Sequence, residues 1–345
     1  MKGERRRKRA SMKAGRRFVK GRGGKTSLTG DTLFLTAVQS LSKSARSFGR
    51  PLFLLQWHPH PILDSNRRTQ MYLEVAGRTD VGMIRKHNED NFILLPDENL
   101  FCVADGMGGH ACGEVASEMA VTEIAEFFKT TSEDEEVTWP FRMDKDRTYD
   151  ENRIAVAIKL ANRRIYEKSQ RNPQQRGMGT TIVSVYCKGS DVIVAHVGDS
   201  RIYRYIMSEK KLVQVTEDHS LLNDYIRTGK LKTPEQIKKF PHKNVILRAL
   251  GIKENVAVDV SRISPSEGDT FLLCSDGLSG MIDDTMMNSI LSSEPDLKLA
   301  VDKMISGANA NGGKDNVTCV LVRWHGGDGR SVCTSIPETA TVHSR

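Results

Sequence analysis

The feature of this sequence that most constrains its fold is a succession of short apolar and β-branched runs separated by short polar turns. Some runs follow one another after only a few residues, as residues 180–187 and 191–196 do around Gly189. A parallel crossover needs about a dozen residues, so such short connections favour antiparallel hairpins. The β-rich runs lie at residues 72–76, 91–95, 100–104, 180–187, 191–196, 201–206, 211–215, 256–260, 270–274 and 316–322.

Helical patterns interrupt these runs, with apolar residues recurring every three or four positions. We therefore expect an α+β fold, a central sandwich of two antiparallel β-sheets flanked by α-helices on both sides, in one domain at residues 71–325. Residues 326–345 are expected to form a disordered tail. The helical patterns lie at residues 113–129, 149–170, 220–228, 283–291 and 297–308.

Charge separates the N-terminal segment from the rest of the chain. Residues 1–70 hold 17 Lys and Arg against 3 acids, a net charge of +14, and subtracting this from the chain's +8 leaves −6 for residues 71–345. The segment lacks a periodic apolar face, so we expect a basic, disordered extension. It could also be an arm for nucleic acid or an anionic membrane surface, a transit peptide, or the result of a start codon placed too early. We expect no nucleic-acid binding outside it.

Composition excludes several classes of protein. No apolar run approaches the roughly 20 residues that span a bilayer, so no transmembrane helix is expected. The 6 cysteines form no Cys-x-x-Cys pair, and 4 of them lie in apolar runs, which is typical of reduced thiols in a cytoplasmic protein. None is followed six residues later by Arg, which excludes the loop of cysteine phosphatases.

Acidic residues recur where the expected strands end. Asp105 and Asp276 follow apolar runs almost directly, and each is succeeded by glycine. An isolated Asp-Gly is typical of a turn, but several unpaired carboxylates converging at the rim of a core are costly and call for a cation. Carboxylates suit Mg²⁺ or Mn²⁺, whereas zinc usually recruits His or Cys. The acidic motifs centre on Glu89, Asp90, Asp105, Asp199, Asp276 and Asp315.

From about residue 75 to residue 324 the sequence resembles the metal-dependent PPM-type (type 2C) protein phosphatases, in their bacterial form. That family has a central pair of antiparallel sheets flanked by helices, in agreement with the pattern above. The motifs that carry the resemblance are Arg85-Lys86-His87-Asn88-Glu89-Asp90, Asp105-Gly106-Met107-Gly108-Gly109-His110, Gly179-Thr180-Thr181, Gly198-Asp199-Ser200-Arg201, Thr216-Glu217-Asp218-His219-Ser220, Ser275-Asp276-Gly277 and Asp315-Asn316-Val317-Thr318.

The resemblance implies a phosphoprotein phosphatase that binds two Mn²⁺ or Mg²⁺ ions. Asp105 would bridge the two ions, with Asp276 and Asp315 on the first ion and the Gly106 carbonyl on the second. Two ions about 4 Å apart lower the pKa of a shared water, and this hydroxide would attack phosphorus directly.

Four further residues receive roles from the same resemblance. Glu89 and Asp90 would support the second metal or its waters, and Asp199 matches the position that holds a weaker third ion. Arg85 matches the arginine that grips the phosphate, and its planar fork suits that task.

The resemblance also leaves points open. Animal members of the family have a histidine, proposed to protonate the leaving oxygen, where this chain has Met107, so we expect a metal-bound water to act as the acid. We expect His87, His110, His219 and His242 to be structural hydrogen-bonding residues. His219 lies at the start of a segment, residues 217–245, that resembles the family's mobile flap.

The expected substrates are proteins phosphorylated on serine or threonine, and the chain would oppose serine/threonine kinases as a monomer. The alternative is a catalytically inactive module that binds phosphoproteins on the same fold, which would have lost its metal ligands. A further alternative is an anchoring role for the basic N-terminus, which would show as salt-dependent retention on heparin.

We predict that a chain shortened to begin at Met71 folds and keeps full activity toward small phosphate esters, since residues 1–70 carry charge but no apolar face. Its melting temperature, followed by circular dichroism, should barely differ from that of the full chain. A large loss of stability would show that the N-terminus docks on the domain.

Overall fold

The computed structural model describes residues 72–108, 112–133, 138–242 and 244–326. The expected basic extension at residues 1–70 lies outside the described residues, as does almost all of the expected tail. In the described part of the chain, no helix has the length and hydropathy needed to cross a membrane. The five cysteines in this part are buried and form no disulfide.

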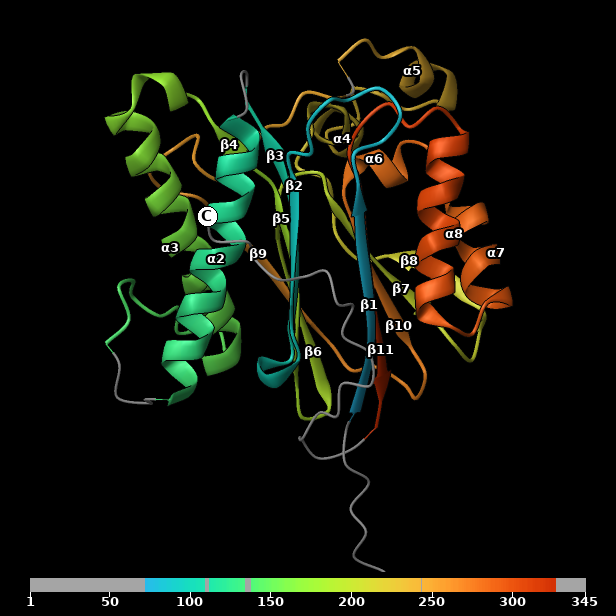
Figure 1. Ribbon diagram of the computed structural model, residues 1–345, viewed down its shortest axis with the longest axis horizontal. Helices are drawn as coiled ribbons and strands as arrows, with labels where there is room; N and C mark the ends of the chain where they lie inside the picture. Colours follow the sequence, from blue (N-terminus) through green and yellow to red (C-terminus); the bar gives the residue numbers. More distant parts are fainter. Residues whose placement is uncertain (1–71, 109–111, 134–137, 243, 327–345) are drawn as a thin grey trace, which may run out of the picture. The chain divides into compact units, whose positions relative to one another are not determined.

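Two antiparallel β-sheets form the centre of the fold (Figure 1). The first has the order β1 (Tyr72–Asp80), β11 (Val317–His325), β10 (Thr270–Cys274), β7 (Arg201–Ile206) and β8 (Lys211–Gln214). The second has the order β2 (Asp90–Leu95), β3 (Leu100–Met107), β5 (Ile182–Lys188), β6 (Asp191–Val197) and β9 (Asp259–Ile263), and β4 (Gly179–Thr180) also pairs with β3.

Helices cover the outer face of each sheet, as expected (Figure 1). The long helices α2 (Cys112–Glu133) and α3 (Tyr149–Arg171) lie on the second sheet, and α7 (Asp284–Ser293) and α8 (Leu297–Ala310) lie on the first. The short helices are η1 (Pro96–Glu98), η2 (Pro173–Gln175), α4 (Leu221–Arg227), α5 (Pro234–Lys239) and α6 (Asp276–Ser279).

The apolar strands separate three layers of core. Side chains alternate between the two faces of a strand, so Phe271 and Leu273 of β10 pack between the sheets while Leu272 and Cys274 face α7 and α8. All of β10 is buried, which explains why its sequence is continuously apolar rather than alternating.

Antiparallel pairing brings the acidic motifs to one end of the sandwich. The end of β3 adjoins the start of β2, and the end of β10 adjoins the start of β11. The end of β6 likewise adjoins the start of β5. Each expected acid stands at one of these ends, so residues that are remote in sequence share one edge.

The expected elements differ from the structure in a few places. We expected a strand at residues 256–260, but β9 begins at Asp259, because Val256 and Val258 pack against the core beside α3 before the chain pairs with β6. The polar helix α5 has no buried residue, so it left no apolar period in the sequence. Asp105 was expected after its strand, yet β3 continues through Asp105 to Met107.

A buried arginine ties α3 to the rest of its layer. The Arg153 side chain is 7% exposed and forms an ion pair of 3.2 Å with Glu98. Its guanidinium also donates to the carbonyl oxygen of Phe128 (2.6 Å), to Thr131 Oγ1 (2.8 Å) and to Tyr186 Oη (3.2 Å). Removing this group deprives Phe128, Thr131 and Tyr186 of one donor each and leaves the Glu98 carboxylate without its cationic partner.

We predict that Arg153→Met lowers the free energy of unfolding by about 3–5 kcal/mol, because it leaves Glu98 unpaired and partly buried. Urea denaturation followed by circular dichroism measures the change. Arg171→Met on the same helix is the matched control: this side chain is 80% exposed, so the loss there should stay within about 0.5 kcal/mol. Equal losses in the two variants would contradict the assignment.

Candidate active site

Two carboxylates face each other across the β2–β3 ladder. Asp90 is the register partner of Asp105, and Asp90 is only 5% exposed. Thr318 Oγ1 donates to Asp90 Oδ2 at 2.6 Å. Burial raises the pKa of Asp90 to about 7, although hydrogen bonds from Thr318 and Ser275 oppose the shift. This residue therefore resists becoming a bare anion without a nearby cation.

The backbone of Asp105 is fixed by two threonines. Its N–H donates to Thr181 Oγ1 at 3.1 Å, and its carbonyl accepts from Thr180 Oγ1 and from the Thr181 N–H, both at 2.9 Å. Thr181 Oγ1 is itself 2.7 Å from Ser200 Oγ. Burial, followed by the charge of Asp90, raises the pKa of Asp105 well above its usual range.

Asp276 and Asp199 complete the buried part of the acidic cluster. Asp276 is the first residue of α6, and burial followed by the Asp315 charge raises its pKa. Asp199 follows β6 and is 9% exposed; burial, Asp276 and Asp218 raise its pKa to about 7. Asp199 Oδ1 is buried and accepts no hydrogen bond from the described residues. Such an orphaned acceptor is costly unless a cation occupies the site.

Arg85 and Asp315 meet on the exposed side of the cluster. The Arg85 guanidinium donates to Asp315 Oδ2 at 2.7 Å, and the two side chains are 48% and 36% exposed. A guanidinium has five N–H donors, so this ion pair leaves donors for a phosphate beside the carboxylates. The alternative is that Arg85 and Asp315 form only a structural ion pair at the surface. Such a pair would not explain why further acids are gathered beside it.

Asn316 holds the loop that carries Arg85. Its Nδ2 donates to the carbonyl oxygens of Val81 (3.0 Å) and His87 (2.9 Å), while its Oδ1 accepts from the Glu89 N–H at 2.9 Å. The side chain is 4% exposed, so the loop between β1 and β2 is pinned from inside. Sequence reasoning gave Asn316 no role, although its place directly after Asp315 was a signal.

The backbone of Gly106 packs closely against the backbones of Glu89 and Gly113. A Cβ at Gly106 would collide with the carbonyl oxygens of Glu89 and Gly113, so only glycine fits there. The Gly106 N–H donates to the Glu89 carbonyl at 3.1 Å, and burial raises the pKa of the Glu89 side chain. The Glu89 side chain and the Gly106 backbone therefore lie close together at the end of β3, and their role toward a second ion stays a prediction.

These residues fit hard divalent cations. Four acids with raised pKa values and one orphaned carboxylate oxygen lie at a single edge, and oxygen ligands of this kind suit Mn²⁺ or Mg²⁺. The donor set contains no cysteine or histidine. The four acids are Asp90, Asp105, Asp199 and Asp276.

A cleft opens beside the cluster. It has a volume of about 440 Å³, and its lining includes Asp199, Asp276 and Asp315. Leu222 and Asn244 also line the cleft, and they belong to the segment, residues 217–245, that is expected to form a flap. In Figure 1 the helices of this segment, α4 and α5, lie at the same end of the sandwich as α6.

The structure brings together all the site residues that the sequence indicated. His110 lies outside the described residues, and Met107 is half-buried at the end of β3. His87 is exposed, and its carbonyl is bound by Asn316. Sequence reasoning named Thr181 and Thr318 within motifs but did not assign them the support of Asp105 and Asp90.

A sandwich of two antiparallel sheets between helices, with an acidic cleft at one edge, is the arrangement that the PPM resemblance implied, and comparison with known proteins agrees. Residues 85–323 match the family model for protein phosphatase 2C. The serine/threonine phosphatase stp of Listeria monocytogenes serotype 4b is 40% identical over 252 residues, covering 71% of this chain and 93% of that protein.

Solved structures give the same answer. The serine/threonine phosphatase PstP/Ppp of Mycobacterium tuberculosis superposes with a TM-score of 0.64 at 30% identity, covering 73% of this chain and 99% of that one. The PstP catalytic domain in complex with two manganese ions has a TM-score of 0.62 at 30% identity, covering 74% of this chain and 100% of that one.

The chain therefore belongs to the protein phosphatase 2C family. The expectation of a metal-dependent serine/threonine phosphatase is confirmed, and the alternative of an inactive binding module is not favoured.

We predict that the metal-free protein loses stability as pH rises toward and beyond 7. A carboxylate whose pKa is raised on folding binds its proton more tightly in the folded state, so its contribution is present in acid and is lost as pH rises through the folded pKa. For Asp90, with its pKa at about 7, the slope reaches about 1.4 kcal/mol per pH unit.

Urea unfolding of chelator-treated protein from pH 5 to pH 8 measures this dependence. Asp90→Asn should make the profile shallower, because the amide still accepts from Thr318 and never ionises, while Asp105, Asp199 and Asp276 keep a smaller dependence. Asp302→Asn, at a side chain that is 52% exposed, is the control and should keep the wild-type slope. An unchanged slope in Asp90→Asn would refute the assignment.

Proposed function

We propose that this chain hydrolyses phosphoserine and phosphothreonine in proteins, with Mn²⁺ or Mg²⁺ held by the acidic edge of the sandwich. Asp105, Asp276, Asp315 and the Gly106 carbonyl would hold the ions, and Asp276 and Asp315 lie close enough to Asp105 for their charges to raise its pKa. The observation that carries the proposal is the orphaned, buried Oδ1 of Asp199 among acids whose pKa values are raised.

Electrostatics explain why cations are required for this substrate. A phosphate dianion would be repelled by a cluster of carboxylates unless positive charge offset them. When bound, the two ions supply that charge and lower the pKa of water near the phosphate. Glu89, whose carbonyl accepts from the Gly106 N–H, and Asp90, the register partner of Asp105, would support the second ion. Asp199 would contribute to a weaker third one.

Arg85 would orient the phosphate. Its guanidinium stands against Asp315 at 2.7 Å, so a phosphate bound by its other donors would lie next to the carboxylates that hold the ions. The loop is pinned by Asn316, and positioning of this kind is a main source of rate acceleration in phosphoryl transfer.

The shape of the cleft favours a phosphorylated side chain on a protein. The cleft combines half-buried apolar groups, Leu222 and Met281, with the exposed Lys314. A cleft lined by apolar and cationic groups of this kind can contact residues on either side of the phosphorylated one. The manganese ions in the PstP catalytic domain and the phosphatase names of the relatives support the same reading.

Further aspects of this function are also proposals. Phosphoserine and phosphothreonine are products of serine/threonine kinases, which this chain would therefore oppose. Its buried cysteines without disulfides support a cytoplasmic setting. The proposed site is built from residues of one chain, which supports a monomer, and light scattering would test this.

We predict that hydrolysis of p-nitrophenyl phosphate and of a phosphothreonine peptide requires Mn²⁺ or Mg²⁺ and stops when EDTA removes the ions. Asp105→Asn or Asp276→Asn should lower kcat by on the order of 10²-fold or more, because each removes ligand charge from the ions. Asp302→Asn, at a half-exposed residue of α8 outside the proposed ligand set, is the matched control and should leave kcat unchanged. Undiminished turnover by metal-free enzyme would overturn the proposal.

A further inference from the structure

His219 closes the base of the flap with its backbone. Its N–H donates to the Gly198 carbonyl at 2.9 Å, and its own carbonyl accepts from the Leu247 N–H at 2.7 Å. Ser220 and Ile246 form the next bridge, so the two ends of the flap are joined at this residue. One position thus touches the start of the flap, its end and the turn after β6.

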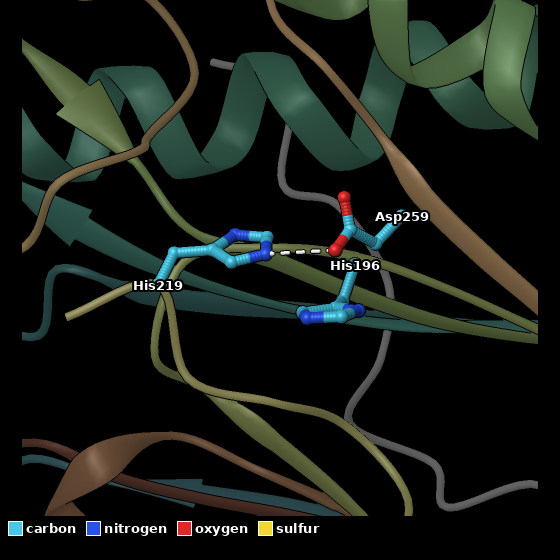
Figure 2. Close-up of side chains that lie close together, drawn as sticks. All are labelled: His196, His219 and Asp259. Carbon is cyan, nitrogen blue, oxygen red and sulfur yellow. Dashed lines mark hydrogen bonds and ion pairs between the residues drawn. The ribbon is translucent and has the colours of Figure 1, made fainter. Parts of the chain in front are cut away.

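The side chain of His219 makes a second bond to the same turn. The Gly198 N–H donates to His219 Nδ1 at 3.1 Å, which requires Nδ1 to be the unprotonated nitrogen. Nε2 therefore carries the proton and donates to Asp259 Oδ2 at 3.2 Å, the bond drawn in Figure 2. The ring also stacks on His196, with centroids 4.6 Å apart.

The same cluster could be mistaken for a metal site. Ligand atoms of His196, His219 and Asp259 lie within 4.8 Å of one another (Figure 2). However, a metal at His219 Nε2 would need the other tautomer and would break the bond from Gly198. The Arg248 guanidinium also stands 3.0 Å from His219 Nε2 and is paired with Asp259, so a cation already fills this place.

Gly198 links His219 to the acidic cluster, because it contacts His219 on one side and Thr181 on the other. Its φ is +119°, and a Cβ would lie 2.6 Å from Thr181, the residue that holds the Asp105 backbone. The next residue is Asp199, whose Oδ1 is buried without a partner. Gly198 is thus held between Thr181 and His219, and any shift of Gly198 moves the Asp199 carboxylate relative to Asp105.

We infer that His219 is a positioning residue whose two ring nitrogens have separate tasks. Nδ1 fixes Gly198 and so aims the Asp199 carboxylate, while Nε2–H fastens the base of the flap to β9 by donating to Asp259, which also pairs with Arg248. The inference rests on the proposed role of Asp199 as a ligand of a weaker third ion.

Two substitutions separate these tasks. In His219→Asn the side-chain oxygen stands near the place of Nδ1 and can still accept from Gly198, but the contact with Asp259 is lost. In His219→Gln the amide reaches toward Asp259, but the acceptor for Gly198 is lost. A purely structural role for His219 predicts that both variants fail alike.

The first measurement is a calorimetric titration of each protein with Mn²⁺. We expect His219→Gln to raise the Kd of the low-affinity Mn²⁺ site about tenfold, because one buried hydrogen bond is lost. His219→Asn should leave this Kd near the wild-type value. Asp199→Asn should raise the same Kd, and adding His219→Gln to it should cause little further rise, because both changes act on one carboxylate.

The second measurement is the rate of trypsin cleavage within the flap, at exposed residues such as Arg227 and Lys230. Here the order reverses: His219→Asn should be cleaved several times faster than the wild type, and His219→Gln should resemble it. Asp259→Asn should follow His219→Asn in this assay, because it weakens the same fastening to β9.

Several results would overturn the inference. Equal changes in the two His219 variants would do so, and so would full additivity of His219→Gln with Asp199→Asn. Metal binding that is lost in both His219 variants and in Asp259→Asn, but retained in Asp199→Asn, would show that the histidines are ligands. Failure of the wild type to hydrolyse p-nitrophenyl phosphate with Mn²⁺ would instead refute the proposed function.

Discussion

The crowding of like charges at one edge of the β-sandwich is the constraint on which the rest of this structure depends. Burial raises the pKa of Asp90, Asp105, Asp199 and Asp276, and their neighbouring charges raise it further. A protein can hold such a group together only with a stable scaffold beneath it and cations above it. The two sheets and their three core layers provide the scaffold. The bound ions offset the charge of the carboxylates and give the cluster its function.

Uncharged side chains hold this cluster in shape. Thr181 binds the Asp105 backbone, Thr318 binds the Asp90 carboxylate, and Asn316 binds three backbone groups of the loop that carries Arg85. Hydroxyl and amide groups fix geometry without adding charge that would compete with the metals. The site is therefore organised before substrate arrives, which is the condition for electrostatic catalysis.

The flap, residues 217–245, has a base that is fixed by hydrogen bonds and helices that bury little surface. Its base is tied by His219 to Gly198 and Leu247, whereas its helices α4 and α5 contain no buried residue. Elements with little buried apolar surface open at low free-energy cost. The wall of the cleft can therefore adapt to different phosphoproteins while the carboxylate next to its base stays in place.

The sequence by itself determined the periodic elements and the identity of the chemistry. Its pattern predicts β7 and β10 with their observed bounds, and its acids after apolar runs predict a hard-cation site, because period and residue type are local properties. Only the tertiary structure decided which groups meet. Strand register sets Asp90 against Asp105 and His196 against Asp259. The loop after β8 adds His219 to the second pair, although His219 and Asp259 are 40 residues apart. No local pattern records such pairings, because they follow from how whole sheets pair and pack.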